Sequence, residues 1–245
     1  MTLSLLLLGT LASVARCAWI RRATWGSPWD AANTLGVVLF GLALTLMSPG
    51  ASRRLGPILH QWTGDWQFED LIGHVCALVG CACLVYNSLV RIARDDEDLD
   101  RLANHLVVPV AYAVPLMFAA FVLTDAKTGQ HLDMLKIPTD NWLKTYWCTT
   151  SLASLWLALV LMWALWIARS DTRCRSVVIH YLAGAVIGAM ASLTCALNAF
   201  TSLPLGNVSW YLGCLATFIF ATVSAAAWRK RLALSAAGGQ SSVGA

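Results

Sequence analysis

Seven apolar stretches, each about twenty residues long, run through the 245-residue chain and leave most of its charge to the short segments between them. The apolar core of a bilayer is about 30 Å thick and a helix rises about 1.5 Å per residue, so each stretch is long enough to cross it. We therefore predict an all-α fold, a bundle of seven transmembrane helices. The expected spans are Leu3–Ile20, Ala31–Ser48, Leu71–Ile92, His105–Thr124, Trp147–Ala168, Ser176–Ala199 and Val208–Trp228.

The composition agrees with this prediction, because the chain is 58% hydrophobic and only 12% charged, whereas a soluble domain carries about 25% charged residues. The longest polar intervals, Ser48–Phe68 and Asp125–Tyr146, are too short to form a soluble domain with its own core. We expect residues 1–231 to form the bundle and residues 232–245, which are rich in small side chains, to form a disordered cytoplasmic tail. The first span could instead be a cleaved secretory signal, but its arginines follow the apolar run, and we expect a retained helix.

The distribution of lysine and arginine predicts the orientation, since cytoplasmic loops of membrane proteins carry the excess. With the N-terminus outside, the inner side collects twelve basic residues, namely Arg16, Arg21, Arg22, Arg91, Arg94, Arg101, Arg169, Arg173, Arg175, Arg229, Lys230 and Arg231. The outer side keeps five, namely Arg53, Arg54, Lys127, Lys136 and Lys144. The pattern favours an outer N-terminus and an inner C-terminus, so the net charge of +4 reflects topology and not a nucleic-acid surface.

Tryptophan placement supports the same topology, because indole rings prefer the boundary between lipid and water. The outer boundary would hold Trp62, Trp66, Trp142, Trp147 and Trp210, and the inner boundary Trp19, Trp25, Trp29, Trp166 and Trp228. The two exceptions, Trp156 and Trp163, lie seven residues apart on one face of the fifth span, where packing or lipid contact is the expected role and a ligand platform the alternative.

Small residues at four-residue spacing predict which helices pack most closely, because spanning helices associate through close backbone approach. Such rows occur in the third, sixth and seventh spans, as Gly73, Ala77 and Cys81, as Gly184, Gly188, Ser192 and Ala196, and as Gly213, Thr217, Ala221 and Ala225. We expect these three helices to form the centre of the bundle. Pro109 and Pro115 cannot donate backbone hydrogen bonds and are expected to kink the fourth span.

Ionisable residues inside a membrane usually mark function, yet no Asp, Glu, Lys or Arg lies near the middle of any predicted span. The embedded titratable groups are His74 and His180. This pattern argues against an ion-coupled carrier.

The outer face holds the densest polar chemistry in the sequence, with His60, Asp65, Glu69, Asp70, His74, His131 and Asp133. We take His60, Asp70, His74 and His131 as candidate ligand-binding residues. Asp70 and His74 share a helix face and are the candidate metal ligands. The alternative is that Glu69 and Asp70 complement the helix dipole while the loop histidines are solvated.

No motif typical of an enzyme occurs, so catalytic residues are not expected. His105 and His180 could suggest a haem, but histidines at the membrane edge are the plainer reading, and we expect no cofactor. The eight cysteines show no disulfide pattern, although a bridge from Cys148 to Cys195 or Cys76 is conceivable.

Arg94–Arg101 is the only dense charge cluster, and its Asp95–Asp100 loop could dock a basic cytoplasmic protein. The plainer account is a solvated connector in which Glu97 pairs with Arg101. Lipids are the expected partners, with a possible homo-oligomer.

The stretch SPGASRRLGPILHQWTGDWQFEDLIGHVCALVG (Ser48–Gly80), in a chain where arginine outnumbers lysine, resembles the loop and third helix of seven-span membrane proteins of actinobacteria and their phages. The resemblance implies a bacterial plasma-membrane protein and transfers no catalytic or binding residue. It leaves three readings: a receptor-like or regulatory bundle without catalytic activity, which we favour; a phage-encoded effector of superinfection exclusion or defence; and a transporter or channel for a neutral solute.

Overall fold

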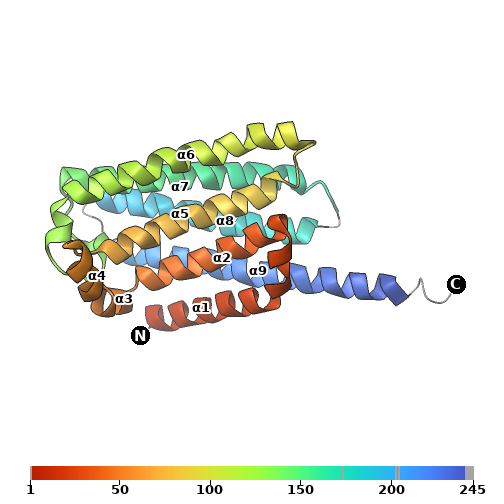
Figure 1. Ribbon diagram of the computed structural model, residues 1–245, viewed down its shortest axis with the longest axis horizontal. Coiled ribbons are helices and arrows are strands. Elements are labelled where there is room, and N and C mark those ends of the chain that lie inside the picture. Colours follow the sequence, from red (N-terminus) through yellow and green to blue (C-terminus); the bar gives the residue numbers. More distant parts are fainter. Residues whose placement is uncertain (1, 173, 202, 204, 241–245) are drawn as a thin grey trace.

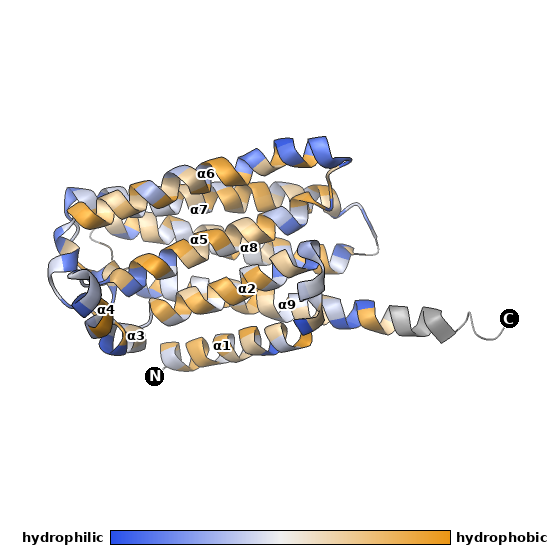
Figure 2. Ribbon diagram, viewed as in Figure 1, coloured by the Kyte–Doolittle hydropathy of each residue, from blue (hydrophilic) through white to orange (hydrophobic). Residues whose placement is uncertain are grey.

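Seven long apolar helices lie side by side in the computed structural model (Figure 1), which describes residues 2–172, 174–201, 203 and 205–240. They are α1 (Thr2–Ile20), α2 (Pro28–Leu46), α5 (Phe68–Leu89), α6 (Asp96–Leu123), α7 (Asn141–Ala168), α8 (Arg175–Phe200) and α9 (Gly206–Gln240). Each is long and apolar enough to cross a membrane, which confirms the predicted bundle of seven membrane helices. Figure 2 shows apolar residues along the middle of the bundle and hydrophilic ones at its two ends.

Short helices cap the bundle where the sequence predicts only polar connections. At one end lie α3 (Pro49–Arg54), α4 (Gly56–Thr63) and the 3₁₀ helices η2 (Asp125–Thr128) and η3 (Met134–Lys136). The 3₁₀ helix η1 (Arg22–Gly26) lies at the opposite end. We call these the outer and the inner end, after the predicted orientation. The N-terminus lies at the outer end and α9 leaves the bundle at the inner end (Figure 1), as an odd number of crossings requires.

Five helices form a ring. Around it, α2 packs on α5, α5 on α7, α7 on α8, α8 on α9, and α9 on α2. The other two lie outside, with α1 against α2 and α9, and α6 against α5 and α7. The interior of the ring is therefore enclosed by protein and not by lipid.

A close crossing of α2 and α5 depends on two glycines that face each other. A Cβ atom added to Gly36 would lie 2.8 Å from the carbonyl oxygen of Gly80, and one added to Gly80 would lie 3.0 Å from the carbonyl oxygen of Gly36. At Gly73 an added Cβ would lie 2.5 Å from Cγ of Met47. Of the three spans predicted to form the centre, α5 and α9 are the two most buried of the seven, whereas α8 is largely exposed at the surface of the bundle. The glycines of α5 pack on α2, which the sequence did not indicate.

The sixth and seventh spans, which carry two of the predicted rows of small residues, pack on each other as α8 and α9. An added Cβ at Gly184 would lie 3.0 Å from the Phe220 ring, so the helices approach closely there. At Gly188 the nearest atom would be Cβ of Ala216, at 3.9 Å, which is an ordinary contact. The packing of α8 on α9 therefore requires a glycine at position 184 but not at position 188.

Three helix boundaries differ from the prediction, each because a polar segment continues the helix. Asp95 caps α6 by accepting a hydrogen bond from the Asp98 amide at 2.8 Å, so the acidic run is the first turn of a helix and not a loop. The predicted Glu97–Arg101 pair is present.

Helix α7 begins at Asn141, six residues before its predicted span. Helix α9 continues to Gln240, where disorder was expected from Leu232; residues 241–245 of that tail lie outside the described residues.

Helix α6 continues through both of its prolines, and α7 compensates for one of them. Pro109 has no amide proton to donate to the carbonyl oxygen of His105, four residues earlier. The indole Nε1 of Trp156 donates to that oxygen at 2.9 Å instead. Lipid offers no hydrogen-bond donor to this oxygen, so Trp156 has a structural role in satisfying it. Among the described residues, no such hydrogen bond is found for Trp163, which lies seven residues later on the same face of α7.

We expect Gly36→Ala to lower the free energy of unfolding by about 1–3 kcal/mol, because the new methyl group overpacks the contact with Gly80. Gly9→Ala is the matched control, since no atom lies within 4 Å of an added Cβ there. Thermal unfolding of the detergent-solubilised variants measures both. Equal melting temperatures for the two variants would contradict the close crossing.

Trp156→Phe should cost about 1–2 kcal/mol by leaving the His105 carbonyl unpaired in apolar surroundings. Trp163→Phe is the control, because Trp163 and Trp156 are both 46% exposed on the same helix. The measurement is again thermal unfolding in detergent. If Trp163→Phe destabilises the protein as much as Trp156→Phe, loss of ring surface and not of the hydrogen bond explains the effect.

Candidate functional site

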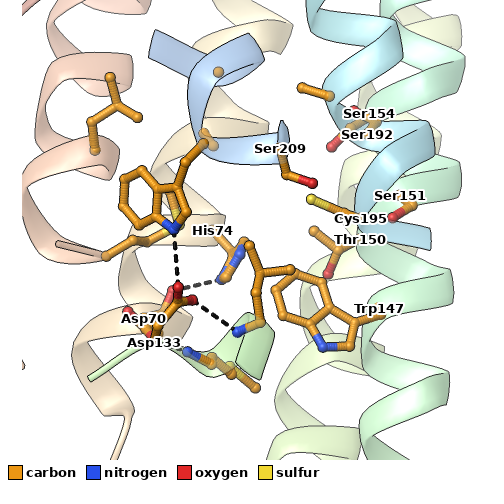
Figure 3. Close-up of a pocket in the computed structure, with 18 residues that line it drawn as sticks. Asp70, His74, Asp133, Trp147, Thr150, Ser151, Ser154, Ser192, Cys195 and Ser209 are labelled. Carbon is orange, nitrogen blue, oxygen red and sulfur yellow. Dashed lines mark hydrogen bonds between the residues drawn. The ribbon is translucent and has the colours of Figure 1, made fainter. Parts of the chain in front are cut away.

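A cavity of about 160 Å³ lies inside the helix ring near the outer end (Figure 3). All five ring helices line it, and η3 and the residue before it cover it from the loop between α6 and α7. Its apolar and aromatic lining comprises Leu44, Met47, Ala77, Met134, Leu135, Trp147, Ala191, Trp210 and Gly213. Its polar lining comprises Asp70, His74, Asp133, Thr150, Ser151, Ser154, Ser192, Cys195 and Ser209.

Asp70 enters the cavity from the first turn of α5 and is only 2% exposed. Its Oδ2 atom accepts one hydrogen bond, from the amide of Met134 at 3.3 Å. Its Oδ1 atom has no hydrogen-bond partner among the described residues. One of the two carboxyl oxygen atoms of Asp70 is therefore buried without a hydrogen bond from the described residues to offset its loss of hydration.

The start of α5 is also held against the loop by Gln67, the residue before the helix. Gln67 has a positive φ of 63°, which side chains with a Cβ rarely adopt. Its Nε2 atom donates to the carbonyl oxygen of His131 at 2.7 Å, and this bond offsets part of the backbone cost. Together with the bond between Asp70 and Met134, it fixes the loop over the cavity.

Asp133 brings a second carboxyl group to the cavity from this loop and is 7% exposed. Its Oδ1 atom accepts from the amide of Leu135 at 3.0 Å, and its Oδ2 atom accepts from the indole Nε1 of Trp210 at 3.3 Å. Lys136 lies 3.6 Å from Oδ2, but its own side chain is 63% exposed. Asp133 is therefore better satisfied than Asp70, although the cation beside it, Lys136, is largely exposed.

His74 lies one helical turn after Asp70 and also lines the cavity. Its Nδ1 atom is 2.8 Å from the backbone oxygen of Asp70 and 3.0 Å from the hydroxyl of Tyr146. Because a carbonyl oxygen can only accept, Nδ1 carries the proton, and Nε2 of the neutral ring is left as an acceptor. The rings of Tyr146 and Trp147 meet the imidazole edge-on and hold its orientation.

Two of the four predicted ligand-binding residues, Asp70 and His74, are brought together at the cavity. His60 instead stacks on Trp66 with ring centroids 4.1 Å apart, and the exposed His131 contributes its backbone oxygen only. Neither of them lines the cavity. Among the described residues, no group of three or more His, Cys, Asp or Glu side chains is arranged to hold a metal ion. All eight cysteines are free, so the conceivable bridges from Cys148 are not formed.

Trp147 and Trp210 are the site residues that the sequence assigned to another role. Both were expected at the lipid boundary, but they are 1% and 7% exposed and line the cavity. Asp133 was recognised as part of the outer face, but nothing local indicated that it would enter the bundle. Contacts between distant segments, such as Trp210 with Asp133, leave no local signal in one sequence.

A polar network fills the ring between the cavity and the inner end. Nδ2 of Asn33 donates to the hydroxyl of Tyr181 at 3.0 Å, and the hydroxyl of Ser224 donates to Oδ1 of Asn33 at 3.2 Å. Tyr181 and Ser224 are also hydrogen-bonded to each other. The three residues come from α2, α8 and α9, so the network joins these helices.

Buried charges extend the network to the inner surface. Arg21, only 3% exposed, donates to the hydroxyl of Thr34 at 2.8 Å and to the backbone oxygen of Asp30 at 3.1 Å. The Asp30 carboxylate pairs with Arg231 at 2.9 Å and lies 3.9 Å from Arg91. The sequence placed these residues in connecting segments and did not predict that they would meet.

The loop that carries Asp133 is closed at its base by Asp140. The Asp140 carboxylate accepts from the Thr124 hydroxyl at 2.6 Å, from the Asp125 amide at 2.8 Å and from the Leu143 amide at 2.6 Å. Burial alone would raise the pKa of Asp140, but these hydrogen bonds outweigh it and lower the pKa below its usual value. The ionised side chain thus both caps α7 and holds the two ends of the loop together.

We expect Asp140→Ala to cost about 1–2 kcal/mol of unfolding free energy at neutral pH, because it removes a helix cap and the loop closure. Asp95→Ala, which removes only the equivalent cap of α6, should cost less. The pKa of Asp140 is lower in the folded state than its value of about 3.9 in the unfolded state. Ionised Asp140 therefore adds to the free energy of unfolding above that pH, and this contribution is lost as the pH falls through the folded-state pKa.

Melting temperatures measured from pH 7 down through that range should therefore converge for wild type and Asp140→Ala. A difference that stays constant in acid would contradict the role of the ionised carboxylate.

Comparison with known proteins finds no relative of this chain. No protein-family model, no curated protein and no solved structure matches the chain. The resemblance to seven-span proteins of actinobacteria and phages thus stays an expectation from the sequence. The function has to be inferred from the cavity and from the helices that form it.

Proposed function

We propose that this multipass membrane protein is a receptor-like or regulatory protein without catalytic activity, and that its outer-end cavity binds a small ligand. The observation that carries this proposal is the cavity of about 160 Å³ that five helices line. An apolar cavity of about 150 Å³ engineered in another protein binds benzene, so the space suits a molecule with about one ring. Asp70 and Ser151 line it with buried oxygen atoms that have no partner among the described residues, and a ligand could satisfy both.

Three ring helices connect the cavity to the polar network at the inner end, which supports a regulatory role. Each gives at least one residue to the cavity and one to the network: Leu44 and Asn33 from α2, Cys195 and Tyr181 from α8, and Trp210 and Ser224 from α9. A ligand that changes the packing of these helices around the cavity would also act on the network. The signal would then reach the inner surface without an additional domain.

The contents of the ring favour binding over passage of a solute. Between the cavity and the inner end, the rings of Phe40 and Phe220 stack with centroids 5.9 Å apart. The ring centroid of Tyr181 lies 5.6 Å from that of Phe220. Passage would require these rings and the network of Asn33 and Ser224 to separate. The ring interior therefore supports a receptor-like protein more than a channel for a neutral solute.

A screen of one-ring compounds by thermal unfolding of the purified protein tests this proposal. A ligand at about 100 times its dissociation constant adds about 2.7 kcal/mol to the stability of the folded state, which raises the melting temperature measurably. Gly213→Leu should abolish the stabilisation, because Gly213 lines the cavity and an added Cβ meets nothing closer than 4.0 Å. Gly9→Leu, on the open face of α1, should respond as wild type does.

Compounds that stabilise Gly213→Leu as well as wild type would place binding elsewhere and contradict the proposal. For the regulatory part, a bound ligand should change hydrogen exchange in η1 and in the inner half of α9. The same compounds are then tested for flux across proteoliposomes. Rapid flux would favour the transporter, and protection of a host from phage infection on expression would favour the phage effector.

A further inference from the structure

Three carboxyl groups are buried together at the outer end of the bundle. Glu69, Asp70 and Asp133 are 1%, 2% and 7% exposed. No lysine or arginine is among the described residues that line the cavity, and the one cation beside it, Lys136, is 63% exposed. Three acidic groups are therefore buried at this end of the bundle without a buried counterion among the described residues, and two of them line the cavity.

Such a group of carboxyls is costly unless a proton or a cation neutralises it. Asp70 and Asp133 line the cavity, and Asp70 has fewer hydrogen bonds than Asp133. The Met134 amide donates to its Oδ2 atom, and its Oδ1 atom has no partner among the described residues. A carboxylate has about four acceptor positions. The unpartnered atom is thus a strong acceptor in a site that is large enough for a ligand.

The rest of the lining indicates which kind of cation would fit. A metal ion needs several oxygen or nitrogen ligands, and the described residues hold no group of three or more such side chains arranged for one. An ammonium group needs only hydrogen-bond acceptors, which the carboxyl groups of Asp70 and Asp133 offer together at one side of the cavity. Trp210, which is hydrogen-bonded to Asp133, and Trp147 and Leu44 offer aromatic and apolar surface around these groups, which suits an apolar body and also attracts a cation.

We infer that the ligand of this cavity is a small primary ammonium compound whose charged group pairs with Asp70 beside Asp133 and whose apolar body, about one ring in size, contacts Trp147 and Trp210. This inference rests on the proposed function and adds the chemical class of its ligand. Figure 3 shows the two carboxyl groups close together at one side of the cavity, with Trp147 and the serine and threonine side chains beyond them.

Three probes of nearly equal size and different charge test the inference: benzylammonium, benzyl alcohol and benzoate. We expect benzylammonium to bind wild type at least about tenfold more tightly than either of the others, because a hydrogen bond to a buried charged group gives about that advantage. Isothermal titration calorimetry and thermal unfolding of the purified full chain both report the affinity. This comparison needs no substitution, so it does not depend on the folding of a variant.

Variants then assign the charge. Asp70→Asn should weaken benzylammonium binding at least about tenfold and leave benzyl alcohol unchanged, and Asp133→Asn should weaken it less. The matched control is Asp65→Asn, because Asp65 lies at the same end of the bundle, outside the cavity, in an ion pair with Lys127. This variant should bind as wild type does.

Equal affinities for benzylammonium and benzyl alcohol, both lost in Gly213→Leu, would overturn the ammonium assignment and leave the ligand-binding function intact. Failure of all three probes, while another class of compound binds in the screen, would overturn it in the same way. If no compound of any class binds in a manner sensitive to Gly213→Leu, the proposed function fails as well. Equal weakening in Asp65→Asn and Asp70→Asn would show a general charge effect and would also overturn the assignment.

Discussion

Lipid cannot hydrogen-bond a polar side chain, so every polar group of the spans needs a partner inside the protein, and this constraint governs the whole bundle. It explains why Trp156 donates to the carbonyl oxygen that Pro109 leaves unpaired. The same constraint explains why Asn33, Tyr181 and Ser224 meet inside the ring. These buried polar groups are therefore satisfied by other residues of the protein.

The outer end departs from this rule. Among the described residues, six buried side-chain atoms lack a hydrogen-bond partner, and five of them are at the outer end, namely those of His60, Gln67, Glu69, Asp70 and Ser151. The sixth belongs to Trp228, near the inner end. Two of the five line the cavity. An end that leaves so many polar atoms unpaired is stabilised less by its own contacts, and this is the physical condition under which a ligand contributes most.

The sequence predicts the spans well because hydrophobic length is a local property that each segment carries by itself. All seven predicted spans correspond to long helices. The same local signal identified Asp70 and His74, which share a helix face four residues apart. It could not identify Trp210 or Asp133 as parts of one site, because they are 77 residues apart in the chain and meet only through the fold. Packing partners are equally non-local, and the glycines of α5 could not show that α2 is their partner.

The two halves of the cavity come from parts of the protein with different stiffness. Its apolar walls belong mostly to helices, and two of these, α2 and α5, cross so closely at Gly36 and Gly80 that their backbones have no space to approach further. One of its two carboxyl groups, Asp133, lies on a loop that is held by Asp140 and by side-chain hydrogen bonds to surrounding helices and helix ends, which involve Gln67, Asp70, Asn198 and Trp210.

Loops adapt at lower cost than packed helix crossings. A ligand that joins Asp133 to Asp70 would therefore order the loop first, and only through contact with Trp210 and Met47 would it act on the ring helices. Under the proposed function, this order of events would separate recognition, at the loop and the start of α5, from transmission through α2, α8 and α9.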